Sequence, residues 1–158
     1  MLVALVVSLI LAGCGGQPSS DVQTVRGANF RFEAPAGWQV SRAGDVVTAA
    51  NGPVDLVQVR TYMLLKPYRH ALLAGAVREL DKDAAKLATG LRGKIVSRRT
   101  TRVAGNDARV YTVSYDGKQQ EMTFVLDGSR EFELICRRPA AGDDTPCRRL
   151  TTTFALST

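Results

Sequence analysis

A chain of 158 residues, 45% hydrophobic and 23% charged, has room for one domain with a core of ordinary size. This balance excludes general disorder and a multi-span membrane protein. The net charge of +6 favours anionic partners in principle, but it comes mostly from scattered arginines without an aromatic-rich nucleic-acid motif. We therefore expect no nucleic acid among the partners.

The N-terminus has the pattern of a signal peptide. Residues 1–12 contain no charged side chain, and the apolar run over residues 2–11 is interrupted only by Ser8. This run is shorter than the about 20 apolar residues that a stable transmembrane helix needs, which favours a cleaved signal over a permanent span. Signal peptides normally open with a basic residue, and its absence after Met1 is consistent with a true start upstream.

Cys14 ends the tetrapeptide Leu-Ala-Gly-Cys, which resembles the lipobox of bacterial lipoproteins. The resemblance implies that a diacylglyceryl group is transferred to the thiol before cleavage between Gly13 and Cys14. Residues 1–13 are then a lipoprotein signal peptide. Two or three acyl chains on Cys14, palmitate among them, would hold the protein firmly on the extracytoplasmic face of the cell membrane. The alternative is an ordinary signal peptide that happens to contain a cysteine.

Gly, Pro and Ser dominate residues 15–20, a composition typical of flexible spacers. We expect residues 14–28 to form the lipidated cysteine and its tether. Residues 29–158 are expected to form a single α+β sandwich domain. A tether of this length keeps the domain near the bilayer.

The first half of the domain alternates apolar and polar residues, as half-buried strands do. Phe30 and Phe32 flank a polar residue, and Trp38 and Val40 repeat the period of two, with the tryptophan expected as a core anchor. Two further strands, over 46–50 and 56–63, flank turn residues and predict a hairpin.

After Pro67 the apolar period changes from two to four. Tyr68, Leu72, Ala76 and Leu80 recur at this spacing, which predicts a helix of about twenty residues closed by Gly90. Its charged residues fall mostly on the opposite side. This helix is expected to cover a sheet.

The second half predicts four strands, over 95–103, 108–115, 119–126 and 132–137. The connections are short and carry Asn, Asp and Gly, so neighbouring strands should run antiparallel. Residues 143–155 predict a short terminal helix. The expected fold class is α+β, with an antiparallel β-sheet covered by one long helix and a C-terminal helix.

Several segments resemble small actinobacterial lipoproteins with a PsbP-like α-β-α sandwich. They are the lipobox, the Phe-x-Phe-x-x-Pro-x-Gly-Trp run over 30–38, the segment 103–109, and the tail containing Cys136, Cys147 and Phe154. Members of this fold, as the resemblance implies, include an extrinsic photosystem II subunit and a nuclear import factor that binds a GTPase, and they mostly bind or support proteins. No active-site residue carries over, because no matching catalytic motif exists.

Cys136 and Cys147 are expected to form a disulfide, because both lie outside the cytoplasm at the end of a strand and near the start of the terminal helix. Thiol chemistry is the rival interpretation, but the pair lacks Cys-x-x-Cys spacing. A bridge over this short loop would stabilise the fold by about 2 to 3 kcal/mol.

The bridge should also bring four arginines together as a basic patch. Arg137 and Arg138 follow one cysteine, and Arg148 and Arg149 follow the other. A solvated edge is the default interpretation, and a patch that binds anions or lipid headgroups is the alternative.

Catalytic and metal-binding chemistry finds little support. His70, the single histidine, cannot by itself build a zinc site or a Ser-His-Asp triad and is expected at the surface. Glu79, Asp81 and Asp83 lack the spacing and setting of a catalytic carboxylate pair. We expect no metal, no cofactor and no enzymatic activity.

These observations favour a non-enzymatic, membrane-anchored lipoprotein of the cell envelope that binds or supports another envelope protein. The alternative is an extracytoplasmic carrier or sensor that holds a small apolar or anionic molecule or a lipid between sheet and helix. An enzyme would require polar residues such as Tyr62, Tyr68 and Arg109 to converge in one cleft.

Overall fold

The structure is a computed structural model that describes residues 21–157. The predicted signal peptide, the lipidation site at Cys14 and the spacer over 15–20 lie outside the described residues. The expected tether over 14–28 is too long, because Val22–Arg26 form the first strand, β1, and pair with the next. The alternation of polar and apolar residues in this strand is too weak to reveal it in isolation.

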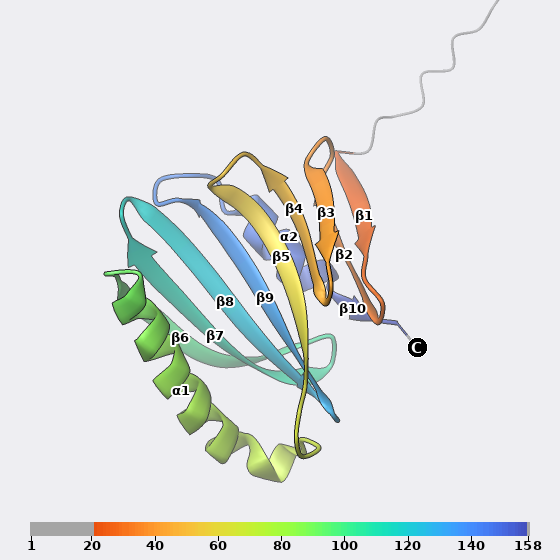
Figure 1. The fold of residues 1–158 in the computed structure, drawn as a ribbon, viewed down its shortest axis with the longest axis vertical. Coiled ribbons are helices and arrows are strands. Elements are labelled where there is room, and N and C mark those ends of the chain that lie inside the picture. The colour runs from red at the N-terminus through yellow and green to blue at the C-terminus, as the bar shows by residue number, and fades with distance from the viewer. Residues whose placement is uncertain (1–20, 158) are drawn as a thin grey trace, which may run out of the picture.

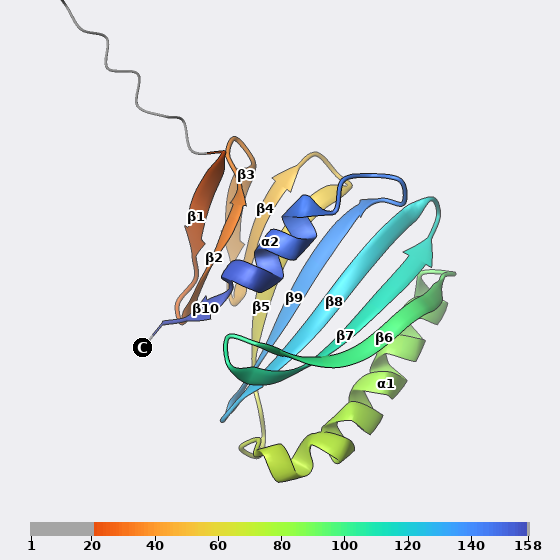
Figure 2. The same ribbon diagram turned by 180° about the vertical axis from the view of Figure 1, so that it is seen from behind.

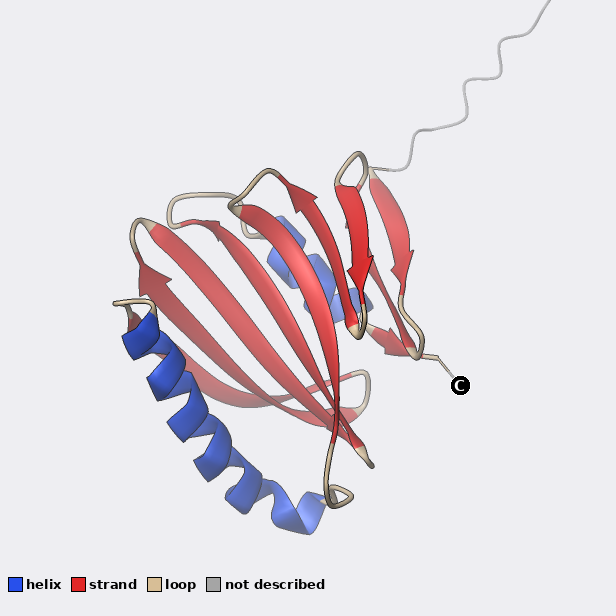
Figure 3. Ribbon diagram, in the orientation of Figure 1, coloured by secondary structure: helices blue, strands red, loops and turns tan. Residues whose placement is uncertain are grey.

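The described residues form two antiparallel sheets and two α-helices (Figure 3). The large sheet has the strand order β3-β4-β5-β9-β8-β7-β6, and the small sheet has the order β1-β2-β10. The strands of the large sheet are β3 (Gln39–Ala43), β4 (Val46–Asn51), β5 (Asp55–Met63), β6 (Lys94–Val103), β7 (Asn106–Tyr115), β8 (Lys118–Asp127) and β9 (Arg130–Pro139). The remaining elements are β2 (Phe30–Pro35), β10 (Ala155–Leu156), the 3-10 turn η1 (His70–Leu72), α1 (Leu73–Gly90) and α2 (Thr145–Thr153).

The elements stack in layers, with the large sheet in the middle. Helix α1 lies against one face near the β6 and β7 edge, whereas α2 and the small sheet lie against the other face (Figures 1 and 2). This arrangement confirms the predicted α+β class with one long helix and a C-terminal helix. The small sheet was not expected, because β10 is only two residues long and is defined by its pairing with β2.

The core on the α2 face is built from aromatic rings. Phe30 of β2 lies 6.0 Å from Phe132 of β9 and 6.0 Å from Phe154, which follows α2. Phe132 and Phe154 meet at 5.5 Å. Trp38 is partly buried and packs against this cluster, so it contributes to the core without lying at its centre. The rings join both sheets and α2 into one packed unit.

The core on the α1 face is smaller. Leu80, Ala84 and Ala88 are the buried residues of α1 and contact the cluster around Tyr111 and Met122 of the sheet. Their spacing of four matches the predicted apolar stripe, which therefore identifies the covered side of the helix.

Helix α1 begins at Leu73, five residues later than the predicted stripe. The backbone N–H of Tyr68 donates to the carbonyl of Gly128 at 2.6 Å, and its hydroxyl donates to Asp107. Tertiary hydrogen bonds therefore hold Tyr68 in the connection after β5, although its spacing matches the helical period.

Tight turns produce the meander from β6 to β9. Between β7 and β8, Asp116 and Gly117 both have positive φ, 46° and 68°. This is the pattern of a two-residue turn whose twist matches antiparallel strands, and Asp-Gly is among its preferred sequences. The local sequence therefore specifies the strand reversal.

Candidate functional site

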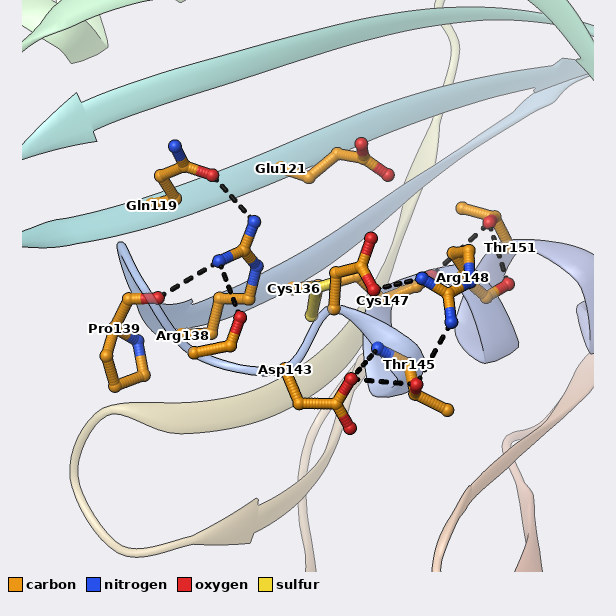
Figure 4. The surroundings of a disulfide bond; sticks show 12 residues. Gln119, Glu121, Cys136, Arg138, Pro139, Asp143, Thr145, Cys147, Arg148 and Thr151 are labelled. Carbon is orange, nitrogen blue, oxygen red and sulfur yellow. Dashed lines mark hydrogen bonds and ion pairs between the residues drawn. A yellow bond between two sulfur atoms is a disulfide. The ribbon is translucent and has the colours of Figure 1, made fainter.

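The predicted disulfide forms between Cys136 of β9 and Cys147 of α2 (Figure 4). The two Cα atoms are 5.3 Å apart, and both residues are buried. The bridge therefore attaches α2 to the centre of the large sheet, and neither cysteine is available as a free thiol.

The structure does not gather all four predicted arginines into one patch. Successive side chains of a strand point to opposite faces, so Arg137 and Arg138 diverge. Arg137 donates to Gln120 at 3.1 Å on the α1 face. Arg138 lies on the disulfide side, where it donates to Gln119 at 2.7 Å and to backbone carbonyls of the loop before α2 (Figure 4).

The two arginines of α2 diverge as well. Arg148 pairs with Asp144 near the disulfide, whereas Arg149 lies 3.3 Å from Glu33 of β2. Arg138 and Arg148 therefore line one cavity, and the other two guanidinium groups lie elsewhere. All four already bond to acceptors within the protein.

The cavity beside the disulfide is small and carries both signs of charge. Its volume is about 150 Å³, and its lining includes Arg99, Glu121, Arg138, Asp144 and Arg148. Burial raises the pKa of the Glu121 carboxyl, against the neighbouring charge of Arg99 at 3.6 Å. At about 30 Å³ per water molecule, this volume suits a few waters.

A larger hollow, which we call the α1 groove, lies between α1 and the sheet. Its volume is about 410 Å³. The floor is apolar and consists of Leu80, Ala84, Leu87, Met122 and Phe124, and the rim carries Tyr62, Asp83, Glu131 and Glu133. Helix α1 packs on β6 and β7 and leaves this side of β9 and β5 uncovered, as Figure 1 shows. Leu87 and Tyr62 are consequently each 39% exposed.

The three carboxylates of the groove have different surroundings. Glu133 accepts a hydrogen bond from the Tyr62 hydroxyl at 3.0 Å, and Asp83 pairs with Lys86 at 3.0 Å. The side chain of Glu131 forms no hydrogen bond or ion pair with any other described residue. Burial, followed by the negative charges of Glu133 and Asp83, raises the pKa of Glu131 to about 7.

Asp81 fastens α1 to the sheet beside the groove. It accepts hydrogen bonds from Tyr111 at 2.5 Å and from Arg109 at 2.9 Å. Burial of Asp81 opposes ionisation, but these bonds outweigh it and lower the pKa of the carboxyl. Burial and the bond to Asp81 raise the pKa of Tyr111 to about 12. We call Asp81, Arg109 and Tyr111 the Asp81 clamp, because their hydrogen bonds hold α1 against the sheet.

A second cluster fixes the connection between β5 and α1. The Tyr68 hydroxyl donates to Asp107 at 2.5 Å, and Nδ1 of His70 lies 2.7 Å from the same oxygen. These contacts, the tyrosine bond first, lower the pKa of Asp107. His70 is exposed as expected, yet it has a partner that the sequence did not reveal.

The polar residues named for an enzyme do not converge. Tyr62 belongs to the groove, Tyr68 to the Asp107 cluster, and Arg109 to the Asp81 clamp. Within residues 21–157, no three metal-ligating side chains lie close enough to hold an ion. No helix in the same range has the length and hydropathy required to cross a bilayer.

The α1 groove was not predicted from the sequence. One available signal was the alternation Glu131-Phe132-Glu133, which places two acids on one face of β9 opposite a core ring. That pattern indicates a solvent-facing strand surface, but it does not reveal that α1 lies beside it.

Comparisons with known proteins support the fold. No protein-family model and no curated protein sequence matches the chain. Among solved structures, cyanobacterial PsbP (CyanoP) from Synechocystis sp. PCC 6803 is similar with a TM-score of 0.64 and 12% identity, covering 92% of this chain and 98% of that one. A crystal structure from Bacteroides thetaiotaomicron is similar with a TM-score of 0.57 and 12% identity, covering 82% of this chain and 45% of that one. The chain therefore spans less than half of the Bacteroides protein, and at this identity the likeness shows a PsbP-like fold alone.

Proposed function

We propose that this protein is a non-enzymatic lipoprotein module, anchored through Cys14 at the extracytoplasmic face of the membrane, that binds another envelope protein through the α1 groove. The observation that carries this proposal is the incomplete cover of the large sheet by α1. It leaves an apolar floor open to solvent, with Leu87 and Tyr62 each 39% exposed. Hollows of this kind are typical of interaction sites.

The position of the groove relative to the anchor supports this role. A tether from Cys14 would join the domain at β1, and β1 and α1 lie on opposite sides of the molecule in both Figures 1 and 2. A domain held by that tether can present α1 away from its anchor. The PsbP-like fold supports a binding role only by analogy, because one fold hosts many functions.

Site-specific photo-crosslinking in intact cells tests the proposal. A photoreactive phenylalanine analogue replaces Leu87 in the groove of the full-length protein, and the control carries it at the exposed Ser41 of β3. We expect a discrete crosslinked partner from position 87, at least about fivefold above position 41, and its loss in a Cys14→Ala background. The proposal would be contradicted if positions 87 and 41 gave the same crosslinked proteins in the same amounts. It would also be contradicted if the purified protein turned over a substrate.

A small-molecule carrier is the second candidate, and the volume of the groove favours it. About 410 Å³ lies within the range of about 300 to 1,000 Å³ that is usual for ligand pockets. Native mass spectrometry of protein purified from its own cells would show one added mass, and Leu87→Glu would remove that mass by placing a charge on the floor. A spectrum without added mass would eliminate this candidate.

A further inference from the structure

We infer, on the basis of the binding role proposed above, that the α1 groove accepts a partner segment that presents a lysine or arginine side chain between apolar residues and pairs that cation with Glu131. Three carboxylates and an apolar surface meet in this groove, and together they specify the chemistry of the partner that the proposed function leaves open.

Glu131 has neighbours on its own strand, on α1, on β5 and on β8. On its own strand it shares a face with Glu133, and Asp83 approaches from α1. From β5 the register partner is Tyr62, and from β8 it is Leu126. Two cations that contact these neighbours are already engaged, because Lys86 pairs with Asp83 and Arg60 donates to Tyr62.

A half-buried carboxylate in this setting lacks a counter-ion. Its raised pKa has burial as the largest cause, followed by two negative neighbours, and no positive group contributes to it. An unpaired, half-buried carboxylate raises the free energy of the protein. A cation that a partner supplies to this carboxylate therefore stabilises the complex. The groove is therefore complementary to a positive group.

The apolar floor of the groove suits the aliphatic stem of a basic side chain. Lysine and arginine have long aliphatic stems that cover apolar surface while the charged end reaches a polar group. The side chains of Leu80, Ala84 and Phe124 can pack against such a stem beside Glu131. The exposed parts of Leu87 and Tyr62 remain, and apolar residues on either side of the cation would cover them.

The carboxylates of the groove have the opposite sign to the net charge of the whole chain. The protein carries a net charge of +6, yet three carboxylates stand on the groove rim. The three carboxylates attract a cation at this site, whereas the net positive charge of the chain does not. Complementary charge of this local kind gives specificity more than raw affinity.

Proton linkage follows from the same contacts. Only the ionised form of Glu131 pairs with a cation, and its pKa is about 7. Binding therefore releases a proton in the acidic range and strengthens as the pH rises through 7. Between about pH 5.5 and about pH 8 the ionised fraction of Glu131 rises roughly thirtyfold, which sets the upper limit on the gain in affinity.

The test is an NMR titration of the full chain, solubilised in detergent, with three capped pentapeptides. Their sequences are Ala-Leu-X-Leu-Ala, where X is lysine, norleucine or glutamate. We expect the lysine peptide to shift the backbone amide signals of Leu87 and Phe124 with at least about fivefold tighter binding than the other two at about pH 8. The lysine preference should shrink at about pH 5.5.

Two variants make the test specific. Glu131→Gln keeps the shape of the side chain, and it should reduce the lysine preference to below about twofold while norleucine binding stays unchanged. Glu121→Gln is the matched control, because burial raises the pKa of that carboxyl too, but it lines the cavity on the opposite face. It should retain the full preference.

Three outcomes would overturn the inference, and none of them depends on the crosslinking result. Equal binding of the lysine and norleucine peptides would show a purely apolar groove, in which case the proposed function survives without this chemistry. Failure of all three peptides to shift the groove signals would reject a linear segment. Binding of butylammonium as tightly as the lysine peptide would identify a site for small organic cations.

Discussion

The two faces of the large sheet are covered in different ways. On the α2 face, aromatic rings from β2, β9 and the residue after α2 pack within about 6 Å of one another, and a disulfide ties the helix to the sheet. On the α1 face, a helix is fastened at one edge by a polar clamp and leaves the α1 groove open. The first face stabilises the domain, and the second leaves open the surface at which we propose that a partner binds.

This contrast has a physical origin in the residues that each helix supplies. Helix α2 is short and is held by the bridge and by the buried Leu150. Helix α1 has twice the length but buries only Leu80, Ala84 and Ala88, two of which are small. A helix that buries little surface needs directional bonds to stay in place, and it cannot cover seven strands.

The largest expected effect comes from breaking the aromatic core. Phe132→Ala removes a fully buried ring that contacts Phe30 and Phe154, and it should lower the free energy of unfolding by about 4 kcal/mol. Leu87→Ala in the groove should cost less than about 1 kcal/mol, because that side chain is already part exposed. Urea denaturation measures both. Equal losses would contradict the contrast between the faces.

Removing the disulfide should have the next largest effect. The double change Cys136→Ala with Cys147→Ala opens a loop of sequence separation 11 and should cost about 3 kcal/mol. Denaturation with and without a reductant provides the control, since reduction should weaken the wild-type protein and leave the variant unchanged. A wild-type protein that is insensitive to reductant under unfolding conditions would refute the structural role of the bridge.

Breaking the clamp should loosen α1 alone. Asp81→Asn removes the charge that Tyr111 and Arg109 bond to, and it should cost about 2 kcal/mol. Amide hydrogen exchange should become faster in α1 and stay unchanged in α2. Asp83→Asn, at an exposed pair with Lys86, is the control and should change stability by less than about 0.5 kcal/mol. Faster exchange in both helices would show that the faces are coupled.

The smallest effect concerns pH. The pKa of Glu131 is raised from 4.5 to about 7, so the folded protein retains this proton where the unfolded chain has released it. Stability should therefore fall as the pH rises from about 4.5 to 7, and this contribution stays lost above 7. Glu131→Gln should remove the dependence and gain about 1 kcal/mol near pH 8, after discounting for solvent screening. Thermal denaturation across this pH range would refute the prediction if the two curves stay parallel.

Local patterns in the sequence were sufficient for most of the fold. The turns at 116–117 and 128, with alternating residues on either side, predicted the antiparallel meander of β7, β8 and β9. The four-residue period predicted which side of α1 is buried. The expected extracytoplasmic compartment and the positions of the two cysteines predicted the bridge between Cys136 and Cys147. Each of these signals lies within a short stretch of chain.

The candidate site could not be predicted from local sequence patterns, because it depends on the tertiary structure. The four arginines of the expected basic patch illustrate this. Proximity to the disulfide suggested that four guanidinium groups would meet, but strand alternation sends Arg137 and Arg138 to opposite faces. Arg149 turns toward Glu33 of the small sheet, whose β1 and β10 were not predicted. The positions of the four guanidinium groups therefore depend on side-chain direction and on partners that are distant in the sequence.

The sequence by itself determined the α+β class, the order of the main strands and helices, and the disulfide, because hydrophobic period, turn chemistry and cysteine context act locally. Only the tertiary structure decided where α1 lies, which faces stay open, and that Glu131 remains unpaired in an apolar groove. The physical reason is that burial and pairing depend on which distant segments pack together, and the free energy of an ionised group depends on both.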